Sequence, residues 1–585
     1  MPCQMMRGAK NPKLPVRSRK RDVKPKITPI GESEVLAFRN TLLQFDADHA
    51  TEKADILNTL LGRPIRSVKV FTAYHDALLL AEAYAPDENL YARCRQELQR
   101  LADLSLQWWN STDERKRYAL SGTGIANSLL VGSFSFELVQ WLVKRFPESF
   151  GLEGQDETEL PFQDLLYRGL HPSENGVTEE RTLELKPWLA RFNGDQRLLS
   201  RLVRIFQELP VSQELRDLLY ENQKLYVEAR LDKPELTRTL ARFSAEPIYF
   251  HSSLLRKINF EEEISRPLPK PISLNERQRQ SLWTNARVTL FNLFRETDPV
   301  TFTDPEETRW YPVGRGTGIA LFFLRPNRRL PLDSYVGYVA YKNGLPQAYG
   351  GSWIFRGQAK IGINIFPAYR GGESSWLFAQ LIRTYSQAFG VKTFAVEPYQ
   401  IGKNNPEGIE SGAFWFYYRH GFRPLQAELR TLAAEEFDKI NAIRRYKSAS
   451  STLRRLAESD LLLLPDGSDA QPFPIRYSRW MTEQFSSHFD GDRKKFVSKS
   501  IQFCKRLGLL PERILNVQER QSLELLAPFV MAVYGNTTAP PPSATVHLSN
   551  WLLSRYQKSE SEWQELSGKC VHLFERLDAL LSGDR

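Results

Sequence analysis

One loop decides the fold of this chain: Pro367-Ala368-Tyr369-Arg370-Gly371-Gly372-Glu373-Ser374-Ser375, at the centre of the region from Tyr335 to Phe422. Three runs before it have the apolar, β-branched and aromatic composition of strands: Tyr335 to Lys342, Leu345 to Phe355 and Lys360 to Phe366. The first two are joined by Asn343-Gly344, and both residue types tolerate the positive φ of a tight hairpin. We therefore predict antiparallel strands that lead into the loop.

A helical pattern follows the loop, from Ser374 to Phe389. Its apolar residues recur at spacings of four, three and four, at Phe378, Ile382, Tyr385 and Phe389. We expect the helix to stop at Gly390 and a fourth strand to run from Val391 to Val396. After a polar loop, a second short helix is predicted to end at Arg419-His420-Gly421-Phe422. The resulting order is strand, loop, helix, strand, helix.

The position of the loop gives it a chemical meaning. A strand that delivers a Gly-rich turn into a helix leaves several backbone N–H groups unpaired at the positive end of the helix dipole, which suits a phosphate or pyrophosphate. Arg370 would add a charge-assisted hydrogen bond. A turn without a ligand is the alternative interpretation of the same residues.

A second motif makes the region from about residue 275 to 440 resemble the GCN5-related N-acetyltransferase (GNAT) family. That family binds the pyrophosphate of coenzyme A on a Gln/Arg-x-x-Gly-x-Gly/Ala loop between its fourth strand and third helix, and Arg370 opens this pattern here. Its last helix often carries Ala-x-x-Phe-Tyr-x-x-x-Gly-Phe, which matches Ala413, Phe416, Tyr417, Gly421 and Phe422. The resemblance implies an α/β fold with a mixed, mostly antiparallel sheet and helices on both faces.

The resemblance also implies a site and a reaction. Acetyl-CoA or another acyl-CoA would be the co-substrate, and a neutral amine would attack its thioester directly. Ile365 would hold the pantetheine arm, Tyr417 would protonate the departing thiolate, and Glu397 at the end of the fourth strand is the candidate base. The pyrophosphate would be surrounded by Arg370, Gly371, Gly372, Ser374 and Ser375. A core tyrosine and a solvated glutamate are the alternatives for Tyr417 and Glu397.

Three residues depart from the family pattern. Glu373 stands where the loop has Gly, Ser375 where it has Gly or Ala, and Glu410 where the last helix is commonly preceded by Asn. A carboxylate beside a pyrophosphate is repulsive unless it points to solvent, whereas a serine hydroxyl can donate to phosphate. The departures support an alternative function, in which the domain binds protein or nucleic acid without catalysis.

The rest of the chain divides around this domain. Apolar residues three or four apart predict helices over most of 31–263, including Ser212 to Leu231, and again over 448–585, including Thr452 to Leu464 and Trp551 to Leu581. Prolines at 267, 269 and 271 predict a linker over 264–274, and Ser273 with Glu276 predicts a capping box for the helix that opens the GNAT-like domain, 275–447. The all-α regions on either side show no catalytic motif.

Composition limits the class of protein. No apolar run approaches the roughly 18 residues of a membrane span. The cysteines lie far apart, at Cys3, Cys94, Cys504 and Cys570, and the eight histidines are scattered, so we expect neither a metal site nor a disulfide framework. These features favour a reducing, cytoplasmic location.

The first 30 residues form a basic arm with few apolar residues, which predicts disorder. The arm holds nine Lys and Arg and one acid, Asp22, so +8 of the net charge of +10 lies within it. A solvated tail is the simpler interpretation. The alternative is contact of residues 7–26 with nucleic acid or another anionic partner.

Overall fold

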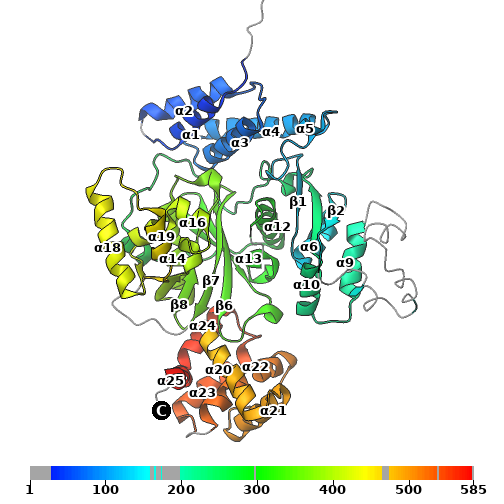
Figure 1. Ribbon diagram of the computed structural model, residues 1–585, viewed down its shortest axis with the longest axis vertical. Helices are drawn as coiled ribbons and strands as arrows, with labels where there is room; N and C mark the ends of the chain where they lie inside the picture. Colours follow the sequence, from blue (N-terminus) through cyan, green and yellow to red (C-terminus); the bar gives the residue numbers. More distant parts are fainter. Residues whose placement is uncertain are drawn as a thin grey trace, which may run out of the picture.

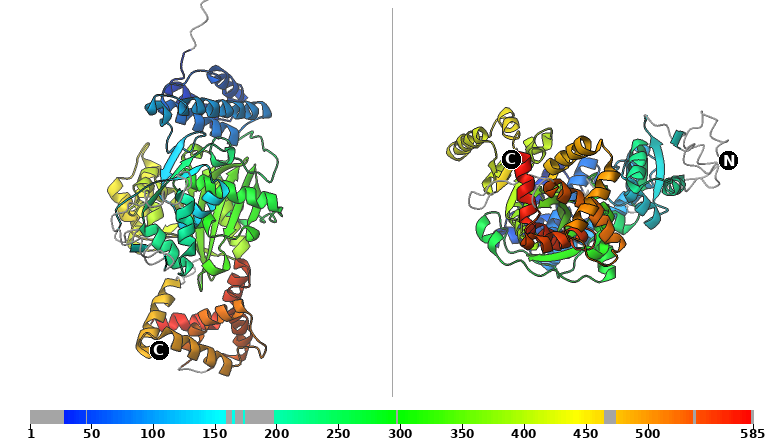
Figure 2. Two further views of the ribbon diagram at one scale, coloured as in Figure 1. Left: turned by 90° about the vertical axis from the view of Figure 1, so that its right-hand side faces the viewer. Right: turned by 90° about the horizontal axis from the view of Figure 1, so that it is seen from below.

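The computed structural model of the protein describes residues 28–45, 47–158, 164–165, 173, 198–295, 298–463, 474–535 and 539–582. Of the basic arm predicted over residues 1–30, the first 27 residues lie outside these ranges, whereas Ile30 at its end is buried in the core. The described residues form three tiers, with N-terminal helices at one end, a central sheet, and C-terminal helices at the other end (Figures 1 and 2). Within these ranges, no helix combines the length and the apolar character that crossing a membrane requires.

Among the described residues, nine strands form the central sheet, in the order β11-β12-β10-β8-β7-β6-β5-β4, with β9 paired to β7. Neighbouring strands are antiparallel except β8 and β10, which are parallel. The prediction of a mixed, mostly antiparallel sheet is therefore confirmed. The strands are β4 (Arg309–Gly314), β5 (Thr317–Phe323), β6 (Ser334–Lys342), β7 (Leu345–Phe355), β8 (Gln358–Ile361), β9 (Asn364–Ile365), β10 (Thr393–Val396), β11 (Arg423–Pro424) and β12 (Leu461–Leu463).

The hairpin of β6 and β7 has the predicted turn, because Asn343 and Gly344 both have positive φ, 47° and 82°. Alternate residues of β6 face opposite sides of the sheet. Val339 and Tyr341 pack with helices α3 (Val68–Ala83) and α12 (Glu276–Asn292), whereas Tyr338 and Ala340 pack with α14 (Ser374–Phe389). Helices thus cover both faces of the sheet (Figure 1).

Helix α14 has the predicted bounds, Ser374–Phe389, and it ends at Gly390 in the left-handed conformation with φ 66°. Its apolar stripe, which includes Phe378, Ile382 and Tyr385, is buried against the sheet. The strand predicted from Lys360 to Phe366 is instead divided into β8 and β9, and the break at Gly362-Ile363 opens the site described below.

The region 31–263 is less uniformly helical than predicted. Helices α1 (Glu32–Leu42), α2 (Ala47–Leu60), α3 and α4 (Glu88–Trp109) form the first tier, but a three-stranded sheet of order β1-β3-β2 follows. The prediction of helix over Ser212 to Leu231 is wrong after α10 (Gln213–Asn222), because Leu225, Val227 and Ala229 are buried at a spacing of two in strand β3 (Leu225–Arg230). The other two strands are β1 (Leu129–Gly132) and β2 (Phe150–Gln155).

The proline-rich segment 264–274 lies against the central domain. The Leu268 N–H donates to Gln387 Oε1 at 2.8 Å, and Ile272 forms a β-bridge with Trp310. Helix α12 is capped by Asn275 and Gln278, not by Ser273 and Glu276 as predicted, because the Asn275 side chain accepts from the Gln278 N–H at 2.9 Å and Gln278 Oε1 accepts from the Asn275 N–H at 3.0 Å.

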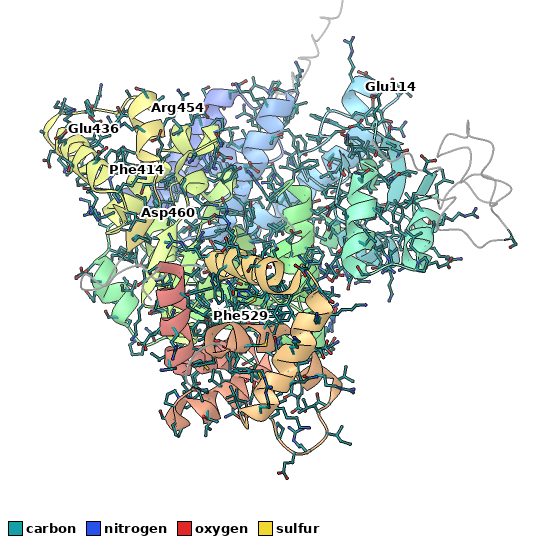
Figure 3. The ribbon with its side chains drawn as sticks, turned by 60° about the horizontal axis from the view of Figure 1, so that its bottom comes forward. Glu114, Phe414, Glu436, Arg454, Asp460 and Phe529 are labelled. Atoms are coloured by element: carbon teal, nitrogen blue, oxygen red, sulfur yellow. The ribbon has the colours of Figure 1, made fainter. Side chains whose placement is uncertain are left out.

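The prediction of a helix from Thr452 to Leu464 is wrong after Leu456. Helix α19 (Ser450–Leu456) ends early, and β12 enters the sheet between β10 and β11, because Leu461 to Leu463 is a short apolar run that completes the sheet. The flank formed by α17 to α19 and the segment before β12 contains Phe414, Glu436, Arg454 and Asp460, whereas Phe529 lies among the C-terminal helices (Figure 3). These flanking helices are α17 (Ala413–Arg419) and α18 (Ala427–Ala442) with α19.

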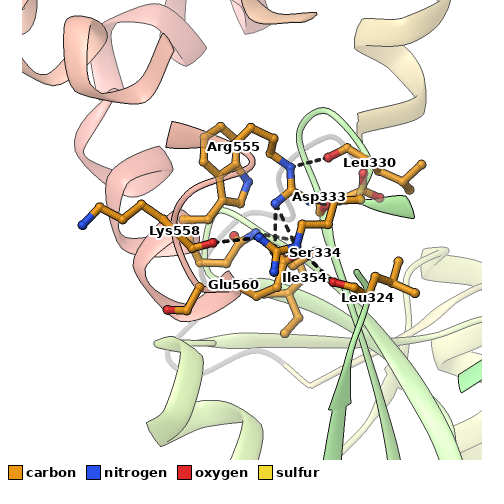
Figure 4. Close-up of polar contacts among 12 residues, drawn as sticks. Leu324, Leu330, Asp333, Ser334, Ile354, Arg555, Lys558 and Glu560 are labelled. Atoms are coloured by element: carbon orange, nitrogen blue, oxygen red, sulfur yellow. Dashed lines mark hydrogen bonds and ion pairs between the residues drawn. The ribbon is translucent and has the colours of Figure 1, made fainter. Parts of the chain in front are cut away.

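The last tier contains helices α20 (Pro474–Phe489), α21 (Arg493–Arg506), α22 (Val517–Tyr534), α23 (Pro542–Ser554), α24 (Glu560–Lys569) and α25 (Val571–Ser582), so the helix predicted from Trp551 to Leu581 is broken. Buried charges join this tier to the sheet. Glu560 lies 3.1 Å from Arg555 Nη1 and 3.3 Å from Arg329 Nε, and all three side chains are almost fully buried. The backbone carbonyls that accept from the two guanidinium groups belong to Leu324, Leu330, Asp333 and Lys558 (Figure 4).

Candidate functional site

A cavity of about 320 Å³ opens where β8 and β10 part. It lies between β9, the loop before α14, and the helices α15 (Pro398–Ile401), α16 (Pro406–Ser411) and α17. Four of the residues predicted to form the site line it: Ile365, Arg370, Ser374 and Tyr417. Gly371, Gly372 and Ser375 belong to the loop and to the start of α14 beside it, and Glu397 is not among the lining residues.

The break between β8 and β9 creates the opening. Lys360 of β8 still pairs with Ala395 of β10, but β9 pairs with β7 alone. The backbone around Ile363 therefore no longer pairs with β10. The side chain of Gln400 lies close to Gly362, where an added Cβ would be 2.8 Å from it. Glycine at this position therefore lets Gln400 approach the break.

The loop delivers free amides to the cavity. Residues Pro367–Tyr369 form a single 3₁₀ turn, and Gly371 has φ 92°, which L-residues rarely adopt. In α14, Leu377 is the first residue whose backbone N–H has an acceptor, the Glu373 carbonyl at 2.9 Å. The N–H groups of Ser374 and Ser375 have no acceptor in the described part of the chain, and they stand at the positive end of the α14 dipole.

Other loop amides are already used within the protein. The Gly372 N–H donates to the Tyr369 carbonyl at 3.3 Å, and the Glu373 N–H donates to the Tyr84 hydroxyl at 3.3 Å. An added Cβ on Gly372 would lie 2.5 Å from that hydroxyl, so the close approach of Tyr84, which directly follows α3, requires glycine. Gly372 thus fits the loop against the N-terminal helices and does not offer its amide to a ligand.

Arg370 faces the cavity with a partner of its own. Its guanidinium lies 2.5 Å from Glu407 Oε1, and Arg295, three residues after α12, lies 3.9 Å from the same carboxylate. The hydrogen bond from Arg370 holds the pKa of Glu407 below its ordinary value. An incoming phosphate would therefore compete with Glu407 for Arg370, at a site with two cations and one anion.

Glu373 turns away from the cavity into the protein interior. Its carboxylate is 1% exposed and accepts from Lys342 Nζ at 2.7 Å, Arg315 Nη2 at 2.6 Å and the Leu255 N–H at 2.9 Å. Burial raises the pKa of Glu373, but Lys342 and Arg315 outweigh this effect and the net shift is downward. The charge that departs from the family pattern is consequently neutralised behind the loop.

The cluster behind the loop satisfies its buried ammonium group completely. Lys342 Nζ also donates to the Arg315 carbonyl at 2.8 Å and to Thr317 Oγ1 at 3.2 Å, which uses its three protons. Burial lowers the pKa of Lys342 to about 8, against the opposing effect of Glu373. The pair is ionised at neutral pH and fixes the residue that precedes α14.

Tyr417 lies at the inner end of the cavity. It is 2% exposed, and its hydroxyl oxygen accepts from the Ile363 N–H at 3.3 Å, at the break between β8 and β9. Burial raises the pKa of Tyr417 to about 12, although the hydrogen bond from Ile363 acts in the opposite direction. The hydroxyl proton has no acceptor among the described residues, so Tyr417 can donate it to a group in the cavity.

The candidate base Glu397 is placed differently. Its carboxylate lies 2.5 Å from Lys360 Nζ and is about half exposed. The carboxylate that does line the cavity is Glu407, which sequence reasoning missed together with Arg295, Tyr349 and Gln400. The polar segment that follows Glu397 offered a signal for Gln400 and Glu407, but nothing near Arg295 or Tyr349 in the sequence links them to the loop.

The N-terminal helices hold the loop from outside, which no sequence motif indicated. Arg39 of α1 donates to the carbonyls of Ala368 at 3.0 Å, Pro367 at 3.2 Å and Arg370 at 3.3 Å. A guanidinium bound to three carbonyls of one loop restricts its conformations. The N-terminal tier is therefore part of the support of the candidate site.

Comparisons with known proteins add no identification: no protein-family model, curated protein or solved structure matches this chain. In the parts of the chain that the structure describes, no three His, Cys, Asp or Glu side chains are grouped so that they could hold a metal ion. The assignment of function therefore depends on the geometry of the cavity.

Proposed function

We propose that the protein is an acyl-CoA-dependent N-acyltransferase of the GNAT type, which transfers an acetyl or other acyl group to an amine. The main support is the cavity at the parting of the parallel strands β8 and β10, since α14 connects these strands and begins there with the free amide of Ser374 in the lining and that of Ser375 next to it. The order of elements is the one that the resemblance implies, and Tyr417 lies where an acid would be needed.

The proposed reaction uses each side of the cavity differently. The pyrophosphate of acyl-CoA binds the α14 amides, and Arg370 exchanges Glu407 for a phosphate oxygen. The pantetheine arm lies along β9 near Ile365. The amine nitrogen then attacks the thioester carbonyl, the C–N bond forms, the C–S bond breaks, and the thiolate takes the proton of Tyr417.

Among the described residues, the cavity lining offers no unpaired carboxylate to accept the proton of the attacking amine. Glu407 keeps Arg295 as a cationic partner at 3.9 Å when Arg370 turns to the phosphate, and Glu397 is paired with Lys360 away from the lining. We therefore propose that the amine enters in its neutral form, that water accepts the proton released on attack, and that water returns a proton to the Tyr417 phenolate once the thiol has formed.

A second candidate function is a GNAT-like binding module without catalysis. The observation that favours it is the ion pair of Arg370 with Glu407, because a cavity whose phosphate-binding cation is already neutralised has less attraction for coenzyme A.

Calorimetric titration with acetyl-CoA separates the two. If the protein is an acyltransferase, we expect acetyl-CoA to bind with a micromolar Kd. Arg370→Glu should then raise this Kd at least about tenfold, a change of roughly 1.4 kcal/mol in binding free energy. The matched control is Arg430→Glu on the exposed side of α18, which changes the charge equally and should leave the Kd unchanged. Absence of binding by acetyl-CoA and by longer acyl-CoA would support the binding module.

A further inference from the structure

Helices α20 and α21 form a two-helix unit joined by a three-residue turn, Asp490 to Asp492. Asp490 and Gly491 have positive φ, 50° and 78°, and the Gly491 N–H donates to the Phe485 carbonyl at 3.0 Å. The Asp492 side chain caps α21 by accepting from the Lys495 N–H at 2.9 Å. Two helices joined by a short Gly-containing turn have the layout of a helix-turn-helix unit.

The second helix of this unit has one buried side. Phe496, Ser500 and Cys504, four residues apart, face the core of the C-terminal tier. Val497, Ile501 and Phe503 are half-buried, the other residues of α21 are exposed and mostly basic, and no acidic residue occurs from 493 to 506. Its exposed cations are Arg493, Lys494, Lys495, Lys499, Lys505 and Arg506, and none of them pairs with a carboxylate in the described part of the chain.

The exposed residues are ordered around the helix. At about 100° per residue, Lys494 and Lys505 lie on one flank, whereas Lys495, Lys499 and Arg506 lie on the other. Between the flanks lie Ser498 and Gln502, which are also exposed. The face is about 21 Å long, with cations along both edges and neutral hydrogen-bonding side chains along the middle.

We propose that α21 binds in the major groove of double-stranded DNA. The cations on the two flanks would contact phosphates of the two strands, and Ser498 and Gln502 would face the edges of the bases. This site is separate from the proposed acyltransferase cavity, and it does not depend on the proposed enzymatic activity.

The chemistry of the face favours DNA over other polyanions. A helix that lies on a membrane turns an apolar side to the lipid, but the apolar side of α21 is buried within the protein. Double-stranded RNA has a major groove too deep and narrow for a helix, whereas that of B-DNA is about 12 Å wide and admits one.

The position of α21 leaves room for a large partner. It lies at the outer end of the molecule, away from the central sheet and from the N-terminal helices (Figures 1 and 2). The tier that carries it is joined to the sheet through the buried Arg555–Glu560 pair, so a bound duplex would be held in a defined relation to the central domain.

Fluorescence anisotropy with a labelled mixed-sequence duplex of about 20 base pairs tests the proposal, using the full chain at about 50 to 200 mM salt. The triple variant Lys494→Gln, Lys499→Gln, Lys505→Gln removes cations from both flanks. We expect its affinity to fall more than about tenfold. Its plot of log K against log salt should become shallower by about 2.7, at roughly 0.9 for each phosphate that the protein no longer neutralises.

Two controls make the result specific. Lys116→Gln, Lys403→Gln, Lys447→Gln removes the same charge from exposed lysines elsewhere and should leave the slope nearly unchanged. Gln502→Ala should keep the slope but flatten the base preference found by selecting from random duplexes.

Circular dichroism should show all variants folded. Equal loss of affinity in both triple variants would overturn the proposal, and so would binding to double-stranded RNA or to anionic vesicles that is as tight as binding to DNA.

Discussion

Two buried charge clusters lie at opposite ends of the central sheet of this protein. The cluster of Glu373, Lys342 and Arg315 lies behind the loop of the candidate site, whereas the cluster of Glu560, Arg555 and Arg329 joins the C-terminal helices to the other end. Both have a nearly inaccessible carboxylate between two cations. Buried clusters of the same composition can therefore serve either a binding site or a junction between domains.

The surroundings of the clusters separate these roles. Glu373 directly precedes the free amides of α14, so a change there alters the start of that helix. Glu560 contacts Ser334 at the start of β6 and is remote from the cavity lining. Disruption of the first cluster should change ligand binding, and disruption of the second should change stability alone.

The largest effect is expected at the C-terminal junction. Glu560→Ala leaves Arg555 and Arg329 buried without their shared carboxylate, which should lower the free energy of unfolding by about 3–5 kcal/mol. Thermal and urea unfolding measure the loss. The control on the same helix is Glu565→Gln, an exposed partner of Lys569, which should cost less than about 0.5 kcal/mol. A weaker affinity of folded Glu560→Ala for acetyl-CoA would contradict the separation of roles.

The next largest effect is expected for Tyr417→Phe in the cavity, which should slow the reaction with little change in the binding of acetyl-CoA. Loss of the proton donor should lower kcat about a hundredfold while the Kd for acetyl-CoA stays within about twofold. Since the pKa of Tyr417 is about 12, the acid form persists in the wild type, and kcat should not decline between about pH 8 and 10 because of this group. A fall in kcat with an apparent pKa near 9 that Tyr417→Phe abolishes would refute this assignment.

Glu373→Gln tests the cluster behind the loop. Replacing the charged partner of Lys342 should cost about 1–3 kcal/mol of stability and weaken acetyl-CoA binding severalfold. The pKa of Glu373 is lowered in the folded protein, so its advantage over Gln is complete above the ordinary glutamate pKa of about 4.3 and declines as pH falls through the lowered value. The free energies of unfolding of the wild type and of Glu373→Gln, measured from about pH 7 to 3, should approach each other as the pH falls. Unchanged acetyl-CoA affinity in Glu373→Gln would remove the cluster from the support of the site.

The smallest effect concerns the partly exposed pair of Arg370 and Glu407. Glu407→Gln frees Arg370 for phosphate, and acetyl-CoA should bind more tightly by at most about 1 kcal/mol, or about fivefold. Glu410→Gln, an exposed glutamate outside the cavity lining, is the matched control. Weaker binding by Glu407→Gln would show that Glu407 contributes to the site in another way.

The sequence was informative where local rules and burial agree. Helix α14 and the hairpin at Asn343-Gly344 could be predicted because the apolar spacing, the turn residues and the packing all favour the same structure. Strand β3 could not, since a six-residue strand after a helix carries apolar positions that also fit a helical spacing, and its partners β1 and β2 lie far away in the sequence.

The candidate site was predictable only in its local part. Ile365, Arg370, Ser374 and Tyr417 belong to two motifs and do line the cavity. Arg39 reaches the loop through tertiary contacts alone, across more than 300 residues of sequence. The burial of Glu373 could not be predicted either. A carboxylate in a loop is expected to be exposed, and only the fold brings Lys342 and Arg315 to it.

The central claim is that the free amides of Ser374 and Ser375 receive a diphosphate. Calorimetric titration of the full chain with acetyl-CoA and, separately, with acetyl-pantetheine tests it most directly, because the two ligands share the acyl arm and differ in the pyrophosphate and nucleotide. We predict that acetyl-CoA binds at least about tenfold more tightly, a difference of roughly 1.4 kcal/mol or more, and that added pyrophosphate competes with it. Equal affinities, or acetyl-CoA binding that pyrophosphate does not weaken, would contradict the account.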